Sequence, residues 1–199
     1  MIAIIDYGAG NLFSVKNALD FIGVKSVITG DKKEIEMAQS LILPGVGAFP
    51  DAMKMLKHEQ LDDVIKKQAK IKPILGICLG MQMLFEKSFE FSQTEGLGLI
   101  DGYIDSVKTS YKIPHIGWNE LEVDKTSPLL DKESKNSYVY FVHSFMAYTA
   151  KENVLAFCDY GIKIPALVCK GNIYGAQFHP EKSGEVGLEM LKKFGGLTQ

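Results

Sequence analysis

The chain has 199 residues, of which 46% are hydrophobic and 23% are charged, and its formal net charge is −2. This length fits one folded unit, so we expect residues 1–199 to form a single domain. The near-neutral charge provides no broad basic surface for nucleic acid or an anionic membrane, and no stretch reaches the ~20 apolar residues of a membrane helix. We also expect no signal peptide, no disulfide framework, no metal and no cofactor, and therefore a cytoplasmic location.

The first half of the chain alternates short apolar runs with helical patterns of apolar residues. Strands are predicted at residues 1–6, 24–28, 40–43 and 73–77. Helices are predicted at residues 12–22, 31–39, 49–70 (in two pieces) and 81–87. Strands that alternate with helices favour right-handed crossovers and a parallel, doubly wound sheet.

The second half is richer in strand patterns. Further strands are predicted at residues 100–107, 138–145, 154–158, 166–170 and 173–178, before a closing helix at 186–194. Turns with Gly or Asn separate several of these strands, which favours antiparallel neighbours. The predicted fold class is therefore α/β, with a doubly wound, mostly parallel sheet and an antiparallel extension.

Cys78 is the strongest candidate nucleophile. It lies in the segment Gly76-Ile77-Cys78-Leu79-Gly80, between an apolar strand and a helical pattern. Small residues two positions to either side of a nucleophile suit a sharp strand-to-helix turn, where larger side chains would clash. Such a turn places the thiol above the carboxyl edge of the sheet and at a helix N-terminus, which favours the thiolate. Cys158 and Cys169 lie in apolar runs and are expected to be structural.

His179 and Glu181 are the candidate base and its orienting carboxylate. They belong to a His-Pro-Glu segment that directly follows a predicted strand. In an extended chain, residues i and i+2 face the same way, and a proline biases the preceding residue toward that conformation. Glu181 can then orient the imidazole while its other nitrogen serves the thiol. Of the other histidines, His58 is expected to be solvated, and His115 and His143 could equally be structural.

A glycine-rich turn could supply the oxyanion hole that such a nucleophile requires. The segment Pro44-Gly45-Val46-Gly47 follows the strand at 40–43, one strand–helix unit before the cysteine. Glycines allow backbone amides to turn toward a ligand at little steric cost. The amide of Leu79, directly after the nucleophile, is the natural second donor. We therefore expect the oxyanion hole to involve Gly45, Val46, Gly47 and Leu79.

The segments PGVG, GICLGMQ and FHPE, in this order, resemble those of the class I (triad-type) glutamine amidotransferases over essentially the whole chain. The resemblance implies a flavodoxin-like fold and hydrolysis of glutamine to glutamate and ammonia. Cys78 would attack the side-chain carboxamide, and His179, held by Glu181, would protonate the departing ammonia. By the same match, the substrate glutamine would be held by Gln82, Glu90, His143 and Ser144.

Four further segments narrow the resemblance. DYGAGNLFSV, PHIGWNEL, YFVHSF and FHPEKSGEVGLEML are similar to segments of the glutaminase subunits of imidazole glycerol phosphate synthases, which work in histidine biosynthesis. This similarity implies a heterodimer with a (βα)8-barrel cyclase that receives the ammonia through an internal passage. Asn11, Trp118 and Asn119 would lie on the docking surface, although Trp118 could equally be a half-buried packing anchor. The sequence has no P-loop and no Gly-x-Gly-x-x-Gly motif, so the ammonia acceptor is expected on another polypeptide.

Other functions share part of this pattern. A paralogous glutaminase that supplies ammonia for amidation of a bacterial surface sugar would have the same pocket motifs. The glutaminase of pyridoxal phosphate synthase has a similar size but fits the PGVG, PHIGWN and YFVHSF segments less well. A catalytically silent regulatory subunit would not need an intact triad, and a cysteine peptidase would need an extended substrate groove.

Overall fold

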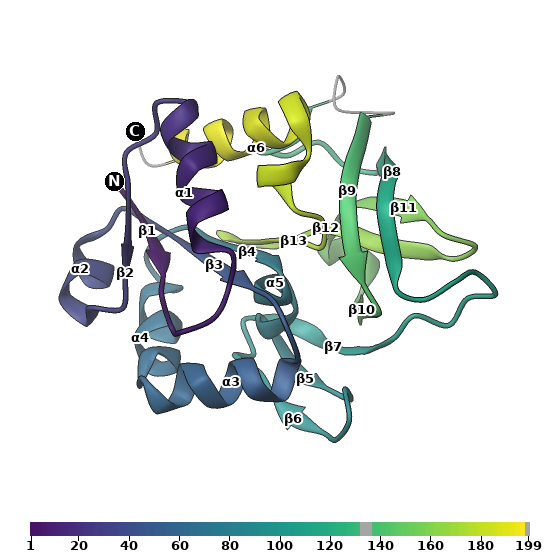
Figure 1. The fold of residues 1–199 in the computed structure, drawn as a ribbon, viewed down its shortest axis with the longest axis horizontal. Helices are drawn as coiled ribbons and strands as arrows, with labels where there is room; N and C mark the ends of the chain where they lie inside the picture. Colours follow the sequence, from purple (N-terminus) through teal and green to yellow (C-terminus); the bar gives the residue numbers. More distant parts are fainter. Residues whose placement is uncertain (132–136, 198–199) are drawn as a thin grey trace.

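The computed structural model describes residues 1–131 and 137–197, which form two sheets flanked by helices (Figure 1). The larger sheet of these described residues contains, in spatial order, β2 (Ser26–Thr29), β1 (Ile2–Ile5), β3 (Ser40–Gly45), β4 (Ile74–Cys78), β13 (Ile173–Ala176), β12 (Lys163–Lys170), β11 (Val154–Asp159), β8 (His115–Val123) and β9 (Ser137–His143). The smaller sheet contains β10 (Phe145–Tyr148), β7 (Ile100–Ser106), β5 (Phe85–Ser88) and β6 (Thr94–Glu95).

The larger sheet is parallel on one side and antiparallel on the other. Strands β2, β1, β3, β4 and β13 pair in parallel. Strands β12, β11, β8 and β9 continue the sheet with antiparallel pairs. Every residue of β1, β3, β4 and β13 is buried, as expected for strands covered on both faces. The predicted α/β class with an antiparallel extension is confirmed.

Helices cover both faces of the parallel strands. Helices α1 (Leu12–Phe21) and α6 (Gly184–Gly196) lie on one face, and α2 (Lys32–Met37), α3 (Phe49–His58) and α4 (Leu61–Gln68) lie on the other (Figure 1). Because successive strand residues point to opposite faces, Ile2 and Ile4 join the core beneath α1 and α6, whereas Ala3 and Ile5 join the second core. None of the described helices is long and apolar enough to cross a membrane.

Three local predictions differ from the structure. The predicted helix 81–87 is wrong beyond Met83, because Phe85 begins strand β5, which pairs with β7. The predicted strand 138–145 breaks at Ser144, where the chain leaves the larger sheet for the smaller one. Strand β8 was not predicted, since its Gly, Trp and Asn residues hide the apolar alternation. Each of these features depends on pairing between distant segments, which overrides local propensity.

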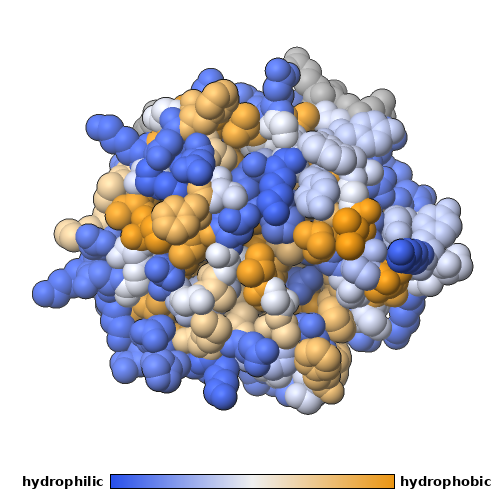
Figure 2. All heavy atoms as spheres, viewed as in Figure 1, coloured by the Kyte–Doolittle hydropathy of each residue, from blue (hydrophilic) through white to orange (hydrophobic). Residues whose placement is uncertain are grey.

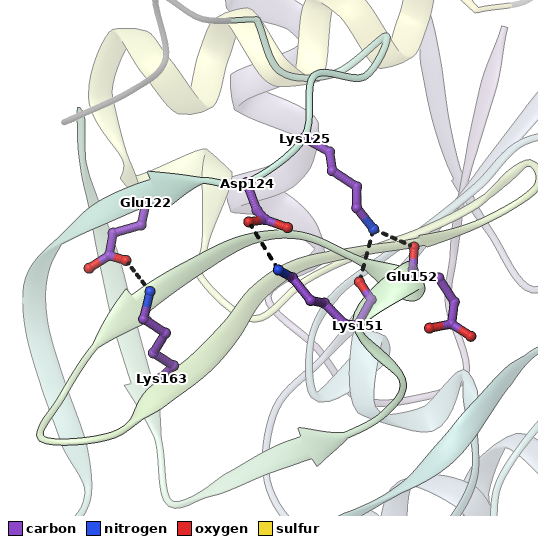
Figure 3. Close-up of polar contacts among 6 residues, drawn as sticks. All are labelled: Glu122, Asp124, Lys125, Lys151, Glu152 and Lys163. Carbon is purple, nitrogen blue, oxygen red and sulfur yellow. Dashed lines mark hydrogen bonds and ion pairs between the residues drawn. The ribbon is translucent and has the colours of Figure 1, made fainter.

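Exposed ion pairs and hydrogen bonds connect residues of the antiparallel strands and the segment next to them (Figure 3). Lys163 pairs with Glu122 at 3.0 Å, and Lys151 pairs with Asp124 at 3.8 Å. The ammonium of Lys125 donates to the backbone carbonyls of Lys151 and Glu152, which belong to the short 3₁₀ turn η2 (Lys151–Asn153). Exposed ion pairs of this kind contribute little to the stability of the fold, because water and salt screen them.

Lys72 is a buried lysine that caps a helix from a distance. Its Nζ donates to the carbonyl oxygens of Ile35, Glu36 and Ala38, at 3.2, 2.8 and 2.6 Å. These carbonyls lie at the C-terminal end of α2, where they have no partners within the helix. Burial lowers the pKa of Lys72, while Glu36 opposes that shift. The single ammonium therefore satisfies several backbone acceptors between α2 and β4.

We expect Lys72→Met to lower the free energy of unfolding by ~2–3 kcal/mol, because it leaves buried carbonyls without a donor. Urea denaturation of the two proteins measures this difference. Lys70→Met, at an exposed position on the same connection, is the matched control and should be nearly neutral. Equal stability of the Lys72 variant and wild type would contradict the capping role.

Candidate active site

Cys78 lies at the sharp turn where β4 passes into the short helix α5 (Leu79–Met83). Its φ is 54° and its ψ is −111°, a conformation that residues other than glycine rarely adopt. A Cβ on Gly80 would lie 1.8 Å from the carbonyl oxygen of Leu43, and one on Gly76 would lie 2.6 Å from the oxygen of Gly80. The two glycines are therefore required for the strand-to-helix turn that presents the cysteine. Since α5 has only five residues, its dipole adds little to this turn.

His179 and Glu181 form a buried pair. Their side chains are 3% and 1% exposed, and Nδ1 of His179 lies 2.9 Å from Oε1 of Glu181. The backbone between the two residues is not extended throughout, contrary to what the sequence had predicted. After His179 the backbone enters the 3₁₀ turn η3 (Pro180–Lys182), and the Ser183 hydroxyl donates to the His179 carbonyl at 2.6 Å. This turn, together with the extended backbone of His179 itself, brings the carboxylate to the imidazole.

The electrostatics of His179 suit a base beside a thiol. Burial lowers its pKa, but Cys78 and Glu181 raise it more, and the result is a pKa of about 9. Nε2 is buried and has no hydrogen-bond partner among the described residues. The Cys78 thiol donates instead to the carbonyl oxygen of Val142, at 3.7 Å. One imidazole nitrogen is thus fixed by a carboxylate, and the other remains available next to the sulfur.

A cavity of about 420 Å³ opens above Cys78, and this volume suits a small ligand such as an amino acid. It is lined by Val46, Gly47, Cys78, Leu79, Gln82, Glu90, Pro114, Val142, His143, Ser144, Phe145 and His179. The structure thus brings together most of the residues that the sequence indicated for catalysis, the oxyanion hole and substrate binding. The described residues include no group of three or more His, Cys, Asp or Glu side chains placed to hold a metal ion.

Three wall residues, Pro114, Val142 and Phe145, were not anticipated. They contribute backbone or apolar atoms, which carry no chemical pattern of their own. Their position next to the PHIGWN and YFVHSF segments is the only feature of the sequence that could have pointed to them. Gly45 does not line the cavity, and Glu181 lies behind His179.

The glycine-rich turn lies level with the nucleophile. Gly45 pairs in register with Cys78 across β3 and β4, so the following Val46 and Gly47 reach the cavity. A Cβ on Gly45 would lie 2.5 Å from the Gly80 nitrogen, so this glycine allows the turn to pack against the cysteine segment. The Tyr7 hydroxyl donates to the Pro44 carbonyl at 3.1 Å and holds the start of the turn.

The polar wall residues have defined partners. The Gln82 amide donates to the carbonyl oxygen of Phe145 at 3.2 Å and to Oε1 of Gln177 at 3.1 Å. The Glu90 carboxylate accepts from the Phe49 amide at 2.7 Å, at the first residue of α3. Burial raises the pKa of Glu90, while the bond from Phe49 opposes that shift.

His143 lines the cavity, but both of its ring nitrogens are already engaged. Nδ1 lies 2.8 Å from the carbonyl oxygen of Phe145, and Nε2 lies 3.0 Å from Nδ1 of His115. The ring therefore forms part of the wall and has no free nitrogen to offer a ligand.

The residues indicated for a docking surface lie outside the cavity. Trp118 is 56% exposed on the outer face of β8, where it contacts Tyr140 of β9 with ring centroids 6.1 Å apart. The Asn119 side chain lies on the opposite face of β8 and donates to the Asp159 carbonyl at 2.8 Å. Asn11 directly precedes α1 and is partly exposed.

The architecture defines the class of cysteine-dependent acyl-transfer enzymes, in which a strand-to-helix cysteine faces a histidine held by a carboxylate. The sequence model of the family "Glutamine amidotransferase class-I" matches residues 3–195. The chain belongs to this family and is a glutamine amidotransferase.

Curated relatives are similar over their whole length. The chain is 53% identical over 200 residues to the "Imidazole glycerol phosphate synthase subunit HisH" of Bacillus cereus, covering 100% of this chain and 96% of that protein. It is 55% identical over 196 residues to the protein of the same name from Oceanobacillus iheyensis, covering 98% of each.

Solved structures share the fold at low sequence identity. One described as "Crystal structure of glutamine amidotransferase" has a TM-score of 0.77 at 19% identity, covering 98% of this chain and 100% of that one. A chain in "Structure of PurLQS from Thermotoga maritima" has a TM-score of 0.78 at 22% identity, covering 100% and 98%. These similarities show that the fold is shared.

We expect Glu181→Gln to lower the pKa of His179 from about 9, because Cys78 alone then opposes the effect of burial. NMR titration of the imidazole measures this shift, and kcat should fall by roughly 10²–10⁴-fold. Glu185→Gln, at an exposed acid nearby, is the control. A His179 pKa that stays near 9 in Glu181→Gln would contradict this account.

The same pKa fixes the direction of a pH effect on stability. His179 binds its proton more tightly in the folded chain than at its ordinary pKa of 6.5, so its contribution is complete below pH 6.5. The contribution is lost as the pH rises through about 9. Glu181→Gln should therefore destabilise the fold more at pH 6 than at pH 9.5, as measured by denaturation at both values.

Proposed function

We propose that this chain is the glutaminase subunit of an imidazole glycerol phosphate synthase and works in histidine biosynthesis. The observation that carries the proposal is the buried His179–Glu181 pair beside Cys78, in a cavity of suitable size for glutamine. The full-length similarity to relatives with that name supports the choice of pathway. We also infer a cytoplasmic location, since Cys78 must stay reduced to act as a nucleophile.

In the proposed reaction, Cys78 is the nucleophile and His179 transfers the proton. Because its pKa is about 9, His179 already carries the proton on Nε2 at neutral pH, and the Cys78 thiolate attacks the side-chain carbonyl carbon of glutamine. Val46, Gly47 and Leu79 line the cavity, and in this proposal their backbone amides would receive the negative charge on the carbonyl oxygen. His179 then donates the proton to the leaving ammonia, and water releases glutamate from the thioester.

Substrate recognition in this proposal falls to the far end of the cavity. The buried carboxylate of Glu90 offers a negative charge for the α-ammonium group of glutamine, and its bond from the Phe49 amide fixes its position. The Gln82 amide holds the Phe145 carbonyl, and the neighbouring Ser144 also lines the cavity. Since both nitrogens of His143 are engaged, this residue would shape the pocket rather than donate to the substrate.

Glutamate release from glutamine tests the proposal directly. We expect the chain together with a barrel cyclase and its nucleotide substrate to release glutamate, and Cys78→Ala to abolish that release. Cys169→Ala, which removes a cysteine outside the cavity, is the control and should remain active. If Cys78→Ala is inactive but the cyclase gives no stimulation, the triad chemistry stands and the histidine pathway is the wrong acceptor.

The isolated chain should be nearly idle, because ammonia released without an acceptor would be protonated and lost. The turn at residues 45–47 is the element we expect to reorient on activation, since one misaimed oxyanion donor costs ~3 kcal/mol. Full glutaminase activity without a partner would contradict this expectation.

A hydrophobic face fits the proposed partner. Ile116, Trp118 and Tyr138 are exposed on neighbouring strands β8 and β9. In the view of Figure 1, hydrophobic residues gather across the middle of the molecule, among polar residues (Figure 2). Exposed aromatic residues that cluster in this way are typical of protein interfaces.

We expect Trp118→Ala to weaken binding of the barrel cyclase by roughly tenfold or more, since exposed tryptophans often dominate interface energies. Isothermal titration calorimetry measures the dissociation constant. Phe21→Ala removes an aromatic residue that is 80% exposed at the end of α1, and it should leave binding unchanged. Equal effects of the two substitutions would place the docking surface elsewhere.

A further inference from the structure

A buried pair of histidines beside the cavity is not used by the proposed reaction. His115 of β8 and His143 of β9 are direct register partners, with Nδ1 of His115 3.0 Å from Nε2 of His143. Both residues are buried. The His115 ring lies between the rings of Phe141 and Tyr160, with centroid distances of 4.8 and 4.0 Å. The pair is therefore held rigidly by stacking as well as by its hydrogen bond.

The donor and the acceptor of each hydrogen bond in this pair can be assigned from the neighbouring groups. The Phe145 carbonyl can only accept, so Nδ1 of His143 carries a proton, and its Nε2 accepts from Nδ1 of His115. Nε2 of His115 then faces the Asn119 amide at 3.4 Å, and that amide also donates to the Asp159 carbonyl. These contacts form a chain of hydrogen bonds from Asn119 through His115 and His143 to the Phe145 carbonyl. We call this chain the histidine relay.

Both imidazoles of the relay are neutral at physiological pH. Burial lowers the pKa of His115 to about 4. Burial also lowers the pKa of His143 to about 4, and the nearby His115 and His179 add to this effect, while the Phe145 carbonyl opposes it. A proton added to Nε2 of His143 would face the N–H of His115, so protonation would break the relay.

The relay ends on the cavity wall that touches the nucleophile. The contact from His143 to the Phe145 carbonyl spans Ser144, the residue at which the chain passes from β9 to β10. On one side of this corner, the Val142 carbonyl accepts from the Cys78 thiol at 3.7 Å. On the other side, the Phe145 carbonyl also accepts from Gln82 at 3.2 Å. The position of His143 therefore sets the wall formed by residues 142–145.

We propose that His115 is a positioning residue for glutamine binding, because it holds His143 and thereby the cavity wall at residues 142–145. The inference rests on the proposed glutaminase function. It adds a structural link between the outer face of β8 and the glutamine cavity. Strand β8 carries His115 on its inner face and Trp118 on its outer face. A shift of β8 when a partner docks against Trp118 would reach the glutamine cavity through the relay.

Two substitutions at one position separate the hydrogen bond from packing. His115→Phe keeps a flat ring between Phe141 and Tyr160 but removes the N–H that holds His143. His115→Asn is smaller but retains an amide N–H close to the place of Nδ1. We expect His115→Phe to raise KM for glutamine roughly tenfold and to leave kcat within about threefold, and His115→Asn to recover most of the lost affinity.

Glutaminase assays of the complete complex test this expectation, with Tyr160→Phe as the control that keeps the stacked ring. A structural defect alone would lower the active fraction, and hence kcat, at an unchanged KM. Equal KM values for wild type and His115→Phe would overturn the proposal, as would a larger loss in His115→Asn than in His115→Phe. If wild type itself shows no glutaminase activity, the proposed function fails instead.

NMR of the chain with ¹⁵N-labelled histidine provides a readout independent of activity and of the variants' folding. The chain has four histidines, so individual assignment is practical. We expect wild-type His115 and His143 to be neutral, with the proton on Nδ1, from pH 5.5 to 8. A wild-type His143 with its proton on Nε2 would overturn the relay.

Discussion

A side chain at Gly80 would place its Cβ 1.8 Å from the Leu43 carbonyl oxygen, and the active site depends on this close approach of two backbone segments. Because Gly45, Gly76 and Gly80 all lack side chains, the end of β3 can lie directly against the turn that carries the cysteine. That contact fixes Cys78 in a left-handed conformation and brings the glycine-rich turn level with it. Cys78 and the glycine-rich turn are thus placed by one steric constraint.

Strand β13 and the antiparallel strand β9 together supply the other half of the site. Strand β13 runs parallel to β4, with Ala176 in register with Ile77, so the residues that follow β13 emerge beside Cys78. The His179 amide donates to the Tyr140 carbonyl of β9 at 3.0 Å, which ties the base to the strand bearing the cavity wall. The base therefore follows a parallel strand and is anchored by an antiparallel one.

Two imidazoles line the same cavity with opposite electrostatics. The pKa of His179 rises to about 9 through Cys78 and Glu181, in spite of burial, whereas burial lowers the pKa of His143 to about 4. The difference follows from their partners, since His179 faces a carboxylate and His143 faces another neutral imidazole. The groups that neighbour each imidazole therefore decide whether its pKa lies above or below the ordinary value.

Sequence by itself determined the features that depend on neighbours along the chain. The glycine spacing around Cys78 predicted the turn, and the His-Pro-Glu segment predicted the imidazole–carboxylate contact, although the contact forms through a 3₁₀ turn. The alternation of apolar runs and helical patterns predicted the parallel sheet. These features rest on backbone sterics and local periodicity, which a short segment carries with it.

Only the tertiary structure decided the features that depend on pairing across the sheet. Phe85 begins a strand because β7 lies beside it, and the break at Ser144 exists because β9 and β10 belong to different sheets. His143 was indicated for the glutamine site, and the structure placed it there with its nitrogens already bound to Phe145 and His115. A hydrogen bond between residues 28 apart requires that their strands be in register, and no local pattern sets that register.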